Sequence, residues 1–158
     1  MTVKSKIILA NALAIKISAL KKSGKKIVFT NGCFDLIHAG HVRTFQKAKT
    51  FGDILIVAIN TDASVRKLKG KNRPIVDQQN RAKVLAALES VDFVTFFSEN
   101  TPLKILELLR PDVLVKGADY KLNEIVGRQY VKKVKRIAMV KGISTSFIIS
   151  KILKAYAK

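Results

Sequence analysis

The chain has few of the residues that mark disulfide-rich, zinc-binding or membrane proteins. It contains one cysteine, which excludes an intrachain disulfide and fits a reducing compartment, and two histidines, too few for a Cys/His metal cage. No apolar run reaches the roughly 18 residues that a membrane span needs. The apolar stretch 7–20 is interrupted at helical spacing by Asn11, Lys16 and Ser18, which favours an amphipathic helix over a signal peptide. We therefore expect a cytoplasmic protein without membrane association.

Acidic residues are missing from both ends of the chain. The seven lysines before Asp35 and the nine basic residues from Arg128 onward face no acid, so these flanks hold most of the net charge of +19. A nucleic-acid-binding protein could show this distribution. The lysines are, however, scattered over expected helices with few aromatic residues among them. We therefore favour an enzyme with polyanionic substrates and expect no specific nucleic-acid partner. The alternative from another class is a basic nucleic-acid-binding module.

Apolar runs and helix-like segments alternate along the chain, without internal repeats or linkers. The run 54–60 is apolar on both faces, as buried parallel strands are. The alternation predicts an α/β fold, a Rossmann-like doubly wound parallel sheet in a single domain over 1–158, with an N-terminal helix within 1–24 and a core over 25–153. Strands are expected at 26–30, 54–60, 93–97, 113–116 and 136–140, helices at 7–22, 41–51, 77–88, 101–109, 123–134 and 144–155, and a long polar connection at 61–77.

The two histidines lie three residues apart in a glycine turn. An apolar strand leads into residues 30–41, which read Thr-Asn-Gly-Cys-Phe-Asp-Leu-Ile-His-Ala-Gly-His, and a helix leads out. Backbone N–H groups and the positive end of a helix bind phosphate at such a turn. His38 and His41 can donate hydrogen bonds to oxygens that gain charge during phosphoryl or nucleotidyl transfer. The pair could instead be structural and cap the helix, but the turn favours a functional site.

Two further segments have groups that suit phosphate. Residues 66–74 hold five basic side chains, which could offset the repulsion between two polyanionic substrates or could belong to an ordinary solvated loop. Ser144 is well placed as the N-cap of the last helix, where hydroxyls and free N–H groups also bind phosphate. Both segments follow expected strands, and ligands of parallel sheets bind beyond the carboxyl ends of the strands.

The stretch from Thr30 to His41 resembles the HxGH nucleotidyltransferase superfamily, and within it the heptose 1-phosphate adenylyltransferase domain of ADP-heptose biosynthesis. Segments 68–74, 112–120 and 142–149 agree in order, so the resemblance covers 25–153. It implies an enzyme that transfers AMP from ATP to D-glycero-D-manno-heptose 1-phosphate, giving ADP-heptose and pyrophosphate for lipopolysaccharide core synthesis. Magnesium would be carried by the triphosphate, with no metal ligands from the chain.

The same resemblance bears on which nucleotide is used, ATP or CTP, and on the partners of the protein. Cytidylyltransferases of the superfamily place an arginine shortly before the last motif, where this chain has residues 138–141 without one, which favours the adenylyl branch. A glycerol-3-phosphate-type cytidylyltransferase is the alternative enzyme. The resemblance also implies a homo-oligomer. The chain is too short to include a sugar kinase, so we expect a separate sugar kinase and a phosphatase in the pathway.

The resemblance assigns roles to particular residues. The catalytic residues would be His38, His41 and Lys69. Those that bind the sugar phosphate would be Lys67, Lys69, Arg73 and Arg81. The nucleotide would contact Thr30, Asn31, Gly32, Phe34, His38, His41, Lys116, Gly117, Asp119, Gly142, Ser144, Thr145 and Ser146. Asp35 could equally be a ligand or a turn residue, and Arg81 could instead form a surface salt bridge. Two residues depart from the family pattern. Ala118 stands where family members often have a glycine, and Ser146 stands where they have a threonine, so that a hydroxyl remains.

Overall fold

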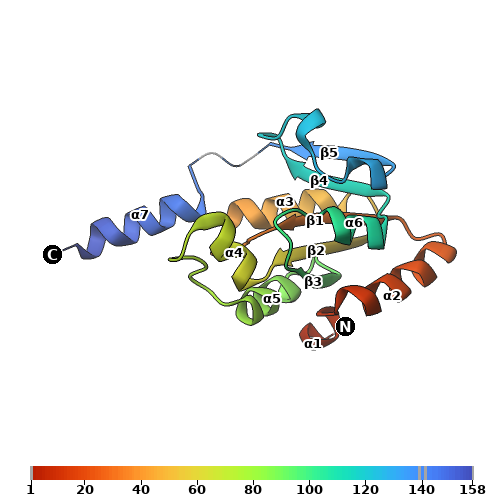
Figure 1. Ribbon diagram of the computed structural model, residues 1–158, viewed down its shortest axis with the longest axis horizontal. Helices are drawn as coiled ribbons and strands as arrows, with labels where there is room; N and C mark the ends of the chain where they lie inside the picture. The colour runs from red at the N-terminus through yellow and green to blue at the C-terminus, as the bar shows by residue number, and fades with distance from the viewer. Residues whose placement is uncertain (1, 139, 141, 158) are drawn as a thin grey trace.

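A five-stranded parallel sheet forms the centre of the protein. The structure is a computed structural model that describes residues 2–138, 140 and 142–157. Its strands follow the order β3-β2-β1-β4-β5 (Figure 1). All four strand pairs are parallel, and the change of direction in strand order falls between β1 and β4. The strands are β1 (Ile27–Gly32), β2 (Ile54–Asn60), β3 (Phe93–Phe97), β4 (Val113–Gly117) and β5 (Lys133–Ile137). The expected doubly wound α/β fold is confirmed.

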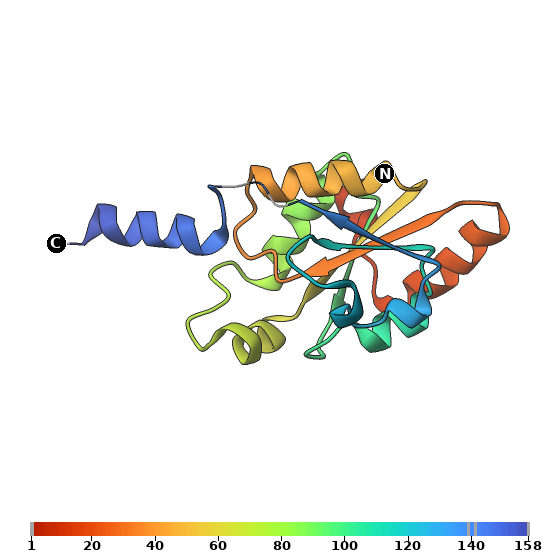
Figure 2. The same cartoon turned by 90° about the horizontal axis from the view of Figure 1, so that it is seen from above.

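Helices cover both faces of the sheet. Helices α3 (Ala39–Lys49) and α5 (Gln78–Ala87) lie on one face, and α2 (Ala10–Lys22) and α6 (Leu103–Leu109) on the other (Figure 2). Successive residues of a strand point to opposite faces, so Ile27 and Phe29 pack with α2 and α6 while Val28 packs with α3 and α5. All three side chains are fully buried. Burial on both faces explains why β1 to β4 could be predicted from apolar runs. Strand β5 is not buried, and it begins three residues before the strand expected at 136–140.

The N-terminal helix is interrupted, which the sequence did not predict. A short helix, α1 (Val3–Lys6), precedes α2, and between them Ile7 forms a parallel bridge with Val94 on the edge strand β3. The N–H of Ile8 donates to the carbonyl of Val94 at 2.9 Å. The chain leaves the helical path at this point because its backbone pairs with the open edge of the sheet. The predicted end of α2 at Ser23 and Gly24 is confirmed, with Gly24 at φ +81°.

Two other expectations were wrong. The segment expected as a polar connection contains helix α4 (Asp62–Lys69), capped by the Thr61 hydroxyl. The helix expected over 123–134 is absent, and two short 3₁₀ turns, Leu122–Glu124 and Arg128–Tyr130, lead into β5 instead. Gly127 lies between these turns at φ +84°, where a Cβ would meet Leu106 at 2.3 Å. A left-handed glycine packed this closely ends a helix.

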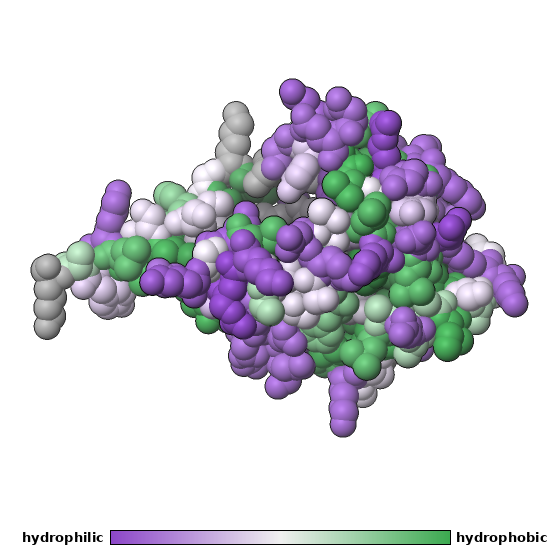
Figure 3. All heavy atoms as spheres, viewed as in Figure 1, coloured by the Kyte–Doolittle hydropathy of each residue, from purple (hydrophilic) through white to green (hydrophobic). Residues whose placement is uncertain are grey.

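The last helix, α7 (Thr145–Tyr156), extends away from the sheet (Figures 1 and 2). None of its residues is buried, and Leu153 and Tyr156 are 65% and 82% exposed. Hydrophobic atoms accordingly reach the surface along this helix (Figure 3). Within the described ranges, no helix is both long enough and apolar enough to cross a membrane.

Candidate active site

The histidine loop leaves the carboxyl end of β1 in a tight turn built around Phe34. Phe34 has φ +46°, which is unusual for a residue with a side chain. Its ring folds back over Gly32, where a Cβ would lie 3.0 Å from the ring. The same ring makes edge-on contacts with His41 and Phe45, at centroid distances of 5.3 and 5.1 Å. Gly32 and Phe34 therefore shape the loop, and the Phe34 ring packs against His41.

The two histidines are stacked at the start of α3. Their ring centroids are 3.8 Å apart, with 24° between the ring planes. His38 is the N-cap residue of α3, but its side chain makes no capping hydrogen bond. A Cβ on Gly40 would lie 3.0 Å from His38 Nδ1, so glycine is required for this packing. The structure thus places both imidazoles at the positive end of a helix without using them as caps.

Both imidazoles lie where the neutral form is favoured. Burial, the larger effect, and the neighbouring His38 together lower the pKa of His41 to about 4. Burial also lowers the pKa of His38. Both Nδ1 atoms are buried without a hydrogen-bond partner among the described residues. A buried N–H without an acceptor is costly, which favours the proton on Nε2 and makes Nε2–H the group that can donate to a ligand.

Lys116 reaches the loop from the neighbouring strand. The β1–β4 register brings Asn31 opposite Lys116, and the Lys116 ammonium donates to Asn31 Oδ1 at 2.6 Å. It also lies 5.6 Å from the centre of the Tyr120 ring. Burial lowers the pKa of Lys116 to about 8, against an opposing effect of the Asp119 carboxylate. Asn31 and Lys116 are therefore in direct contact, and the exposed Asp119 is close enough to influence Lys116.

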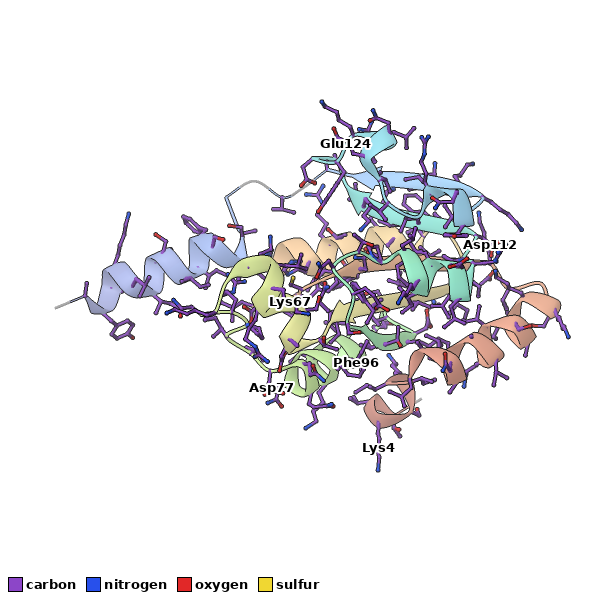
Figure 4. The ribbon with its side chains drawn as sticks, viewed as in Figure 1. Lys4, Lys67, Asp77, Phe96, Asp112 and Glu124 are labelled. Carbon is purple, nitrogen blue, oxygen red and sulfur yellow. The ribbon has the colours of Figure 1, made fainter. Side chains whose placement is uncertain are left out.

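The predicted basic loop is half helical. Lys67 and Lys69 lie in the last turn of α4 and are exposed, while Arg73 lies in the loop beyond it. Lys67 is seen beside the carboxyl end of the sheet in Figure 4. Arg73 Nε donates to Asp35 at 2.5 Å. Lys69 is close enough to influence Cys33, whose pKa is raised by burial and lowered by Lys69, Arg81 and Arg73, burial being the larger effect.

Asp35 fixes the basic loop to the histidine loop. Its carboxylate is 2% exposed and accepts hydrogen bonds from the backbone N–H groups of Ile75 and Val76 as well as from Arg73. These hydrogen bonds and Arg73 hold the pKa of Asp35 below its usual range although burial opposes them. The structure gives Asp35 the part of a local organiser, one of the two roles the sequence left open.

Arg81 is buried beneath the site. It is 1% exposed, so it is not a surface salt bridge. Its guanidinium donates to the carbonyls of Val76, Cys33 and Asn60 and to Asp62 Oδ1 at 2.7 Å. These four acceptors come from three segments that meet at the carboxyl ends of β1 and β2. We infer that Arg81 positions the site rather than touching the substrate.

The start of α7 touches the histidine loop. Ser144 accepts from the Phe147 N–H at 3.1 Å, which confirms its prediction as the N-cap. The Thr145 hydroxyl donates to the carbonyl of Leu36 at 3.4 Å, and Ile143 lies close to Gly40. Gly142 and Ser146 are exposed, and Gly142 has φ +80°. Gly117 ends β4 beside Lys116, and the buried Thr30 hydroxyl donates to the Val115 carbonyl at 3.1 Å.

Sequence reasoning missed the acceptors that hold Arg81 in place. Asn60 and Asp62 were not singled out, although Asn60 is a polar residue at the end of an otherwise apolar strand and Asp62 follows the capping residue Thr61. Asn60 also donates to the Ser64 hydroxyl at 2.9 Å. In the part of the chain that the structure describes, no three His, Cys, Asp or Glu side chains are grouped as metal ligands.

Comparisons with known proteins agree with this architecture. The cytidylyltransferase-like family model matches residues 29–154. The bifunctional protein HldE of Geobacter sulfurreducens is 53% identical over 94% of this chain and 31% of its own length. HldE of Wolinella succinogenes is 56% identical over 84% of this chain and 28% of its own length. The chain thus spans less than a third of the curated relatives it matches.

A solved structure shows the same fold. The crystal structure of the lipopolysaccharide core biosynthesis protein from Thermoplasma volcanium GSS1 has a TM-score of 0.62 and 29% identity, covering 75% of this chain and all of that one. The histidine turn and the serine at the start of α7 both lie within the residues that the family model matches. The chain belongs to the cytidylyltransferase-like family, which confirms the resemblance inferred from the histidine loop.

Replacing Arg81 with lysine is expected to destabilise the protein by about 3 kcal/mol or more. A lysine can satisfy only part of the four acceptors, and buried carbonyls without donors are costly. Urea unfolding should measure the change. Arg43→Lys, at an exposed position on α3, should change the free energy of unfolding by less than about 0.5 kcal/mol. Equal stability of the two variants would contradict the positioning role.

Binding of a nucleoside triphosphate, measured with ATP, is expected to weaken as the pH rises above 8. The Lys116 amine loses its proton there, and an uncharged amine no longer attracts phosphate. The dissociation constant should rise towards tenfold per pH unit until the pKa of the complex is reached. Lys116→Met should bind weakly at every pH without this inflection, whereas Lys104→Met, on the exposed surface of α6, should retain it. If the inflection persists in Lys116→Met, the pH dependence of binding belongs to another titratable group.

Proposed function

We propose that the protein transfers the adenylyl group of ATP to D-glycero-D-manno-heptose 1-phosphate, releasing ADP-heptose and pyrophosphate. The observation that carries the proposal is the stacked pair His38 and His41 at the start of α3, whose pKa values are lowered by burial and whose Nδ1 atoms have no partner among the described residues. Family membership and the similarity to HldE support a nucleotidyl transfer at this site. ATP and the sugar phosphate are the substrates, and Mg²⁺ arrives with the triphosphate.

The reaction is a direct in-line displacement at the α-phosphorus. An oxygen of the sugar phosphate forms the new P–O bond, and the bond to the β-phosphate oxygen breaks, so that pyrophosphate leaves. The nucleophile is already ionised at neutral pH and requires no general base. Catalysis then depends on positioning and on stabilising the charge that develops.

The described side chains divide these tasks. The Nε2–H groups of His38 and His41 donate to phosphate oxygens, and the helix start of α3 adds its positive end. Lys116 adds positive charge from β4, and Lys69 and Lys67 add it from the last turn of α4. Ser144, Thr145 and Ser146 offer hydroxyls and backbone N–H groups at the start of α7, and Arg73 contacts the acceptor phosphate.

Substrate identity is tested by pyrophosphate release, measured with ATP and with CTP against both anomers of heptose 1-phosphate, glycerol 3-phosphate and other sugar 1-phosphates. We expect release with ATP and one heptose 1-phosphate anomer. Release only with CTP and glycerol 3-phosphate would replace the substrates and keep the site. No release with any pair would contradict the proposed function.

Replacing either histidine with alanine is expected to lower kcat by about 10²–10³, the loss typical of one donor to a developing charge. Steady-state kinetics with the preferred substrates should measure it, with KM changing less than kcat. Both variants should remain folded, because neither histidine residue is fully buried and neither belongs to the two apolar clusters of the core. The control Gln46→Ala lies on the exposed face of α3 and should retain wild-type turnover. Turnover near the wild-type value in both histidine variants would contradict the catalytic role of His38 and His41.

A further inference from the structure

The acid-free flanks of the sequence meet in space at the amino end of the sheet. A hollow of about 550 Å³ opens there between the end of α2, the entry to β1 and the starts of β4 and β5. Asp112, at this hollow, and Lys67, at the site, lie towards opposite ends of the molecule (Figure 4). The charged residues that line the hollow are Lys21, Lys25, Lys26, Lys132, Lys133 and Asp112.

The single carboxylate of this lining is already engaged. Asp112 accepts the Ile27 N–H at 2.9 Å and the Lys132 ammonium at 2.8 Å. Five lysines against one aspartate leave a local formal charge of +4. Beyond the lining, Asp53 lies 3.9 Å from Lys25. Both side chains of this pair are exposed, so Asp53 offsets little of the positive charge.

The positive charges of this lining repel one another. Lys21 is partly buried and donates to the carbonyl of Arg110. Burial is the main cause that lowers its pKa, and Lys132 and Arg110 lower it further against the attraction of Asp112. Like charges converge here from segments more than a hundred residues apart in sequence, which destabilises the fold unless an anion offsets them.

We infer that this hollow is a second anion site, for a small oligophosphate such as pyrophosphate or the triphosphate chain of a nucleotide. Its volume is that of a small-molecule pocket, and lysine ammonium groups suit clustered phosphate oxygens. A nucleic acid fits less well, because the lining contains no aromatic side chain on which bases could stack. The inference is independent of the proposed reaction, since the hollow lies at the other end of the strands from the histidines.

Isothermal titration with pyrophosphate at 150 mM salt tests the inference. The wild-type chain should bind two anions, one at the histidine end and one in the hollow. The variant Lys26→Ala/Lys133→Ala should bind one, with the affinity of the remaining site unchanged and the lost site weakened at least tenfold. Both lysines are exposed and outside the catalytic machinery, so folding and turnover should be retained.

A charge-matched control separates the site from general attraction. Lys83→Ala/Lys154→Ala removes the same charge from exposed positions on α5 and α7 and should still bind two anions. Titrating the His38→Ala/His41→Ala variant should leave the hollow's anion in place. A single anion in the wild type, unaffected by Lys26→Ala/Lys133→Ala, would overturn the inference. The inference would also be overturned if Lys26→Ala/Lys133→Ala weakened the binding of an oligonucleotide but not that of pyrophosphate or ATP.

Discussion

The buried guanidinium of Arg81 is the constraint on which the carboxyl end of the sheet depends. A charge without contact with water needs all its donors satisfied, and this requirement fixes three segments around the α5 residue Arg81. The carbonyl of Cys33 sets the exit of β1, and Asn60 and Asp62 set the passage from β2 into α4. Through Val76 and the adjacent hydrogen bonds of Asp35, the same arrangement holds the basic loop against the histidine loop.

The predictability of the fold follows from how each element is stabilised. Strands β2 and β3 were predicted at their observed bounds because burial on both faces requires continuous apolar runs. Helix α4 escaped prediction because only its capping residue and two buried positions mark it. The helix expected over 123–134 does not form because Gly127 has a left-handed backbone and lies so close to Leu106 that a Cβ would not fit. No local sequence pattern reveals this proximity.

The site divides in the same way. His38 and His41 could be predicted because phosphate chemistry places rare residue types in a short glycine turn, where spacing alone is informative. The organisers could not be predicted. Asp35 meets its partners about 40 residues away, and Arg81 meets Cys33 at a separation of 48. An arginine expected to face the substrate therefore proved to be buried, since sequence spacing says nothing about which acceptors surround a side chain after folding.

Under the proposed function, the free site attracts phosphate mainly through its lysines. Two imidazoles with centroids 3.8 Å apart repel each other when both are protonated, and burial lowers both pKa values, so the histidines contribute no net charge before a ligand arrives. Lys69 and Lys116 supply the long-range attraction. A bound triphosphate then raises the pKa of each imidazole, because the anion favours the protonated ring. Burial thus makes the histidines strong donors only when phosphate is present, which concentrates their effect on the reacting complex rather than on the empty site.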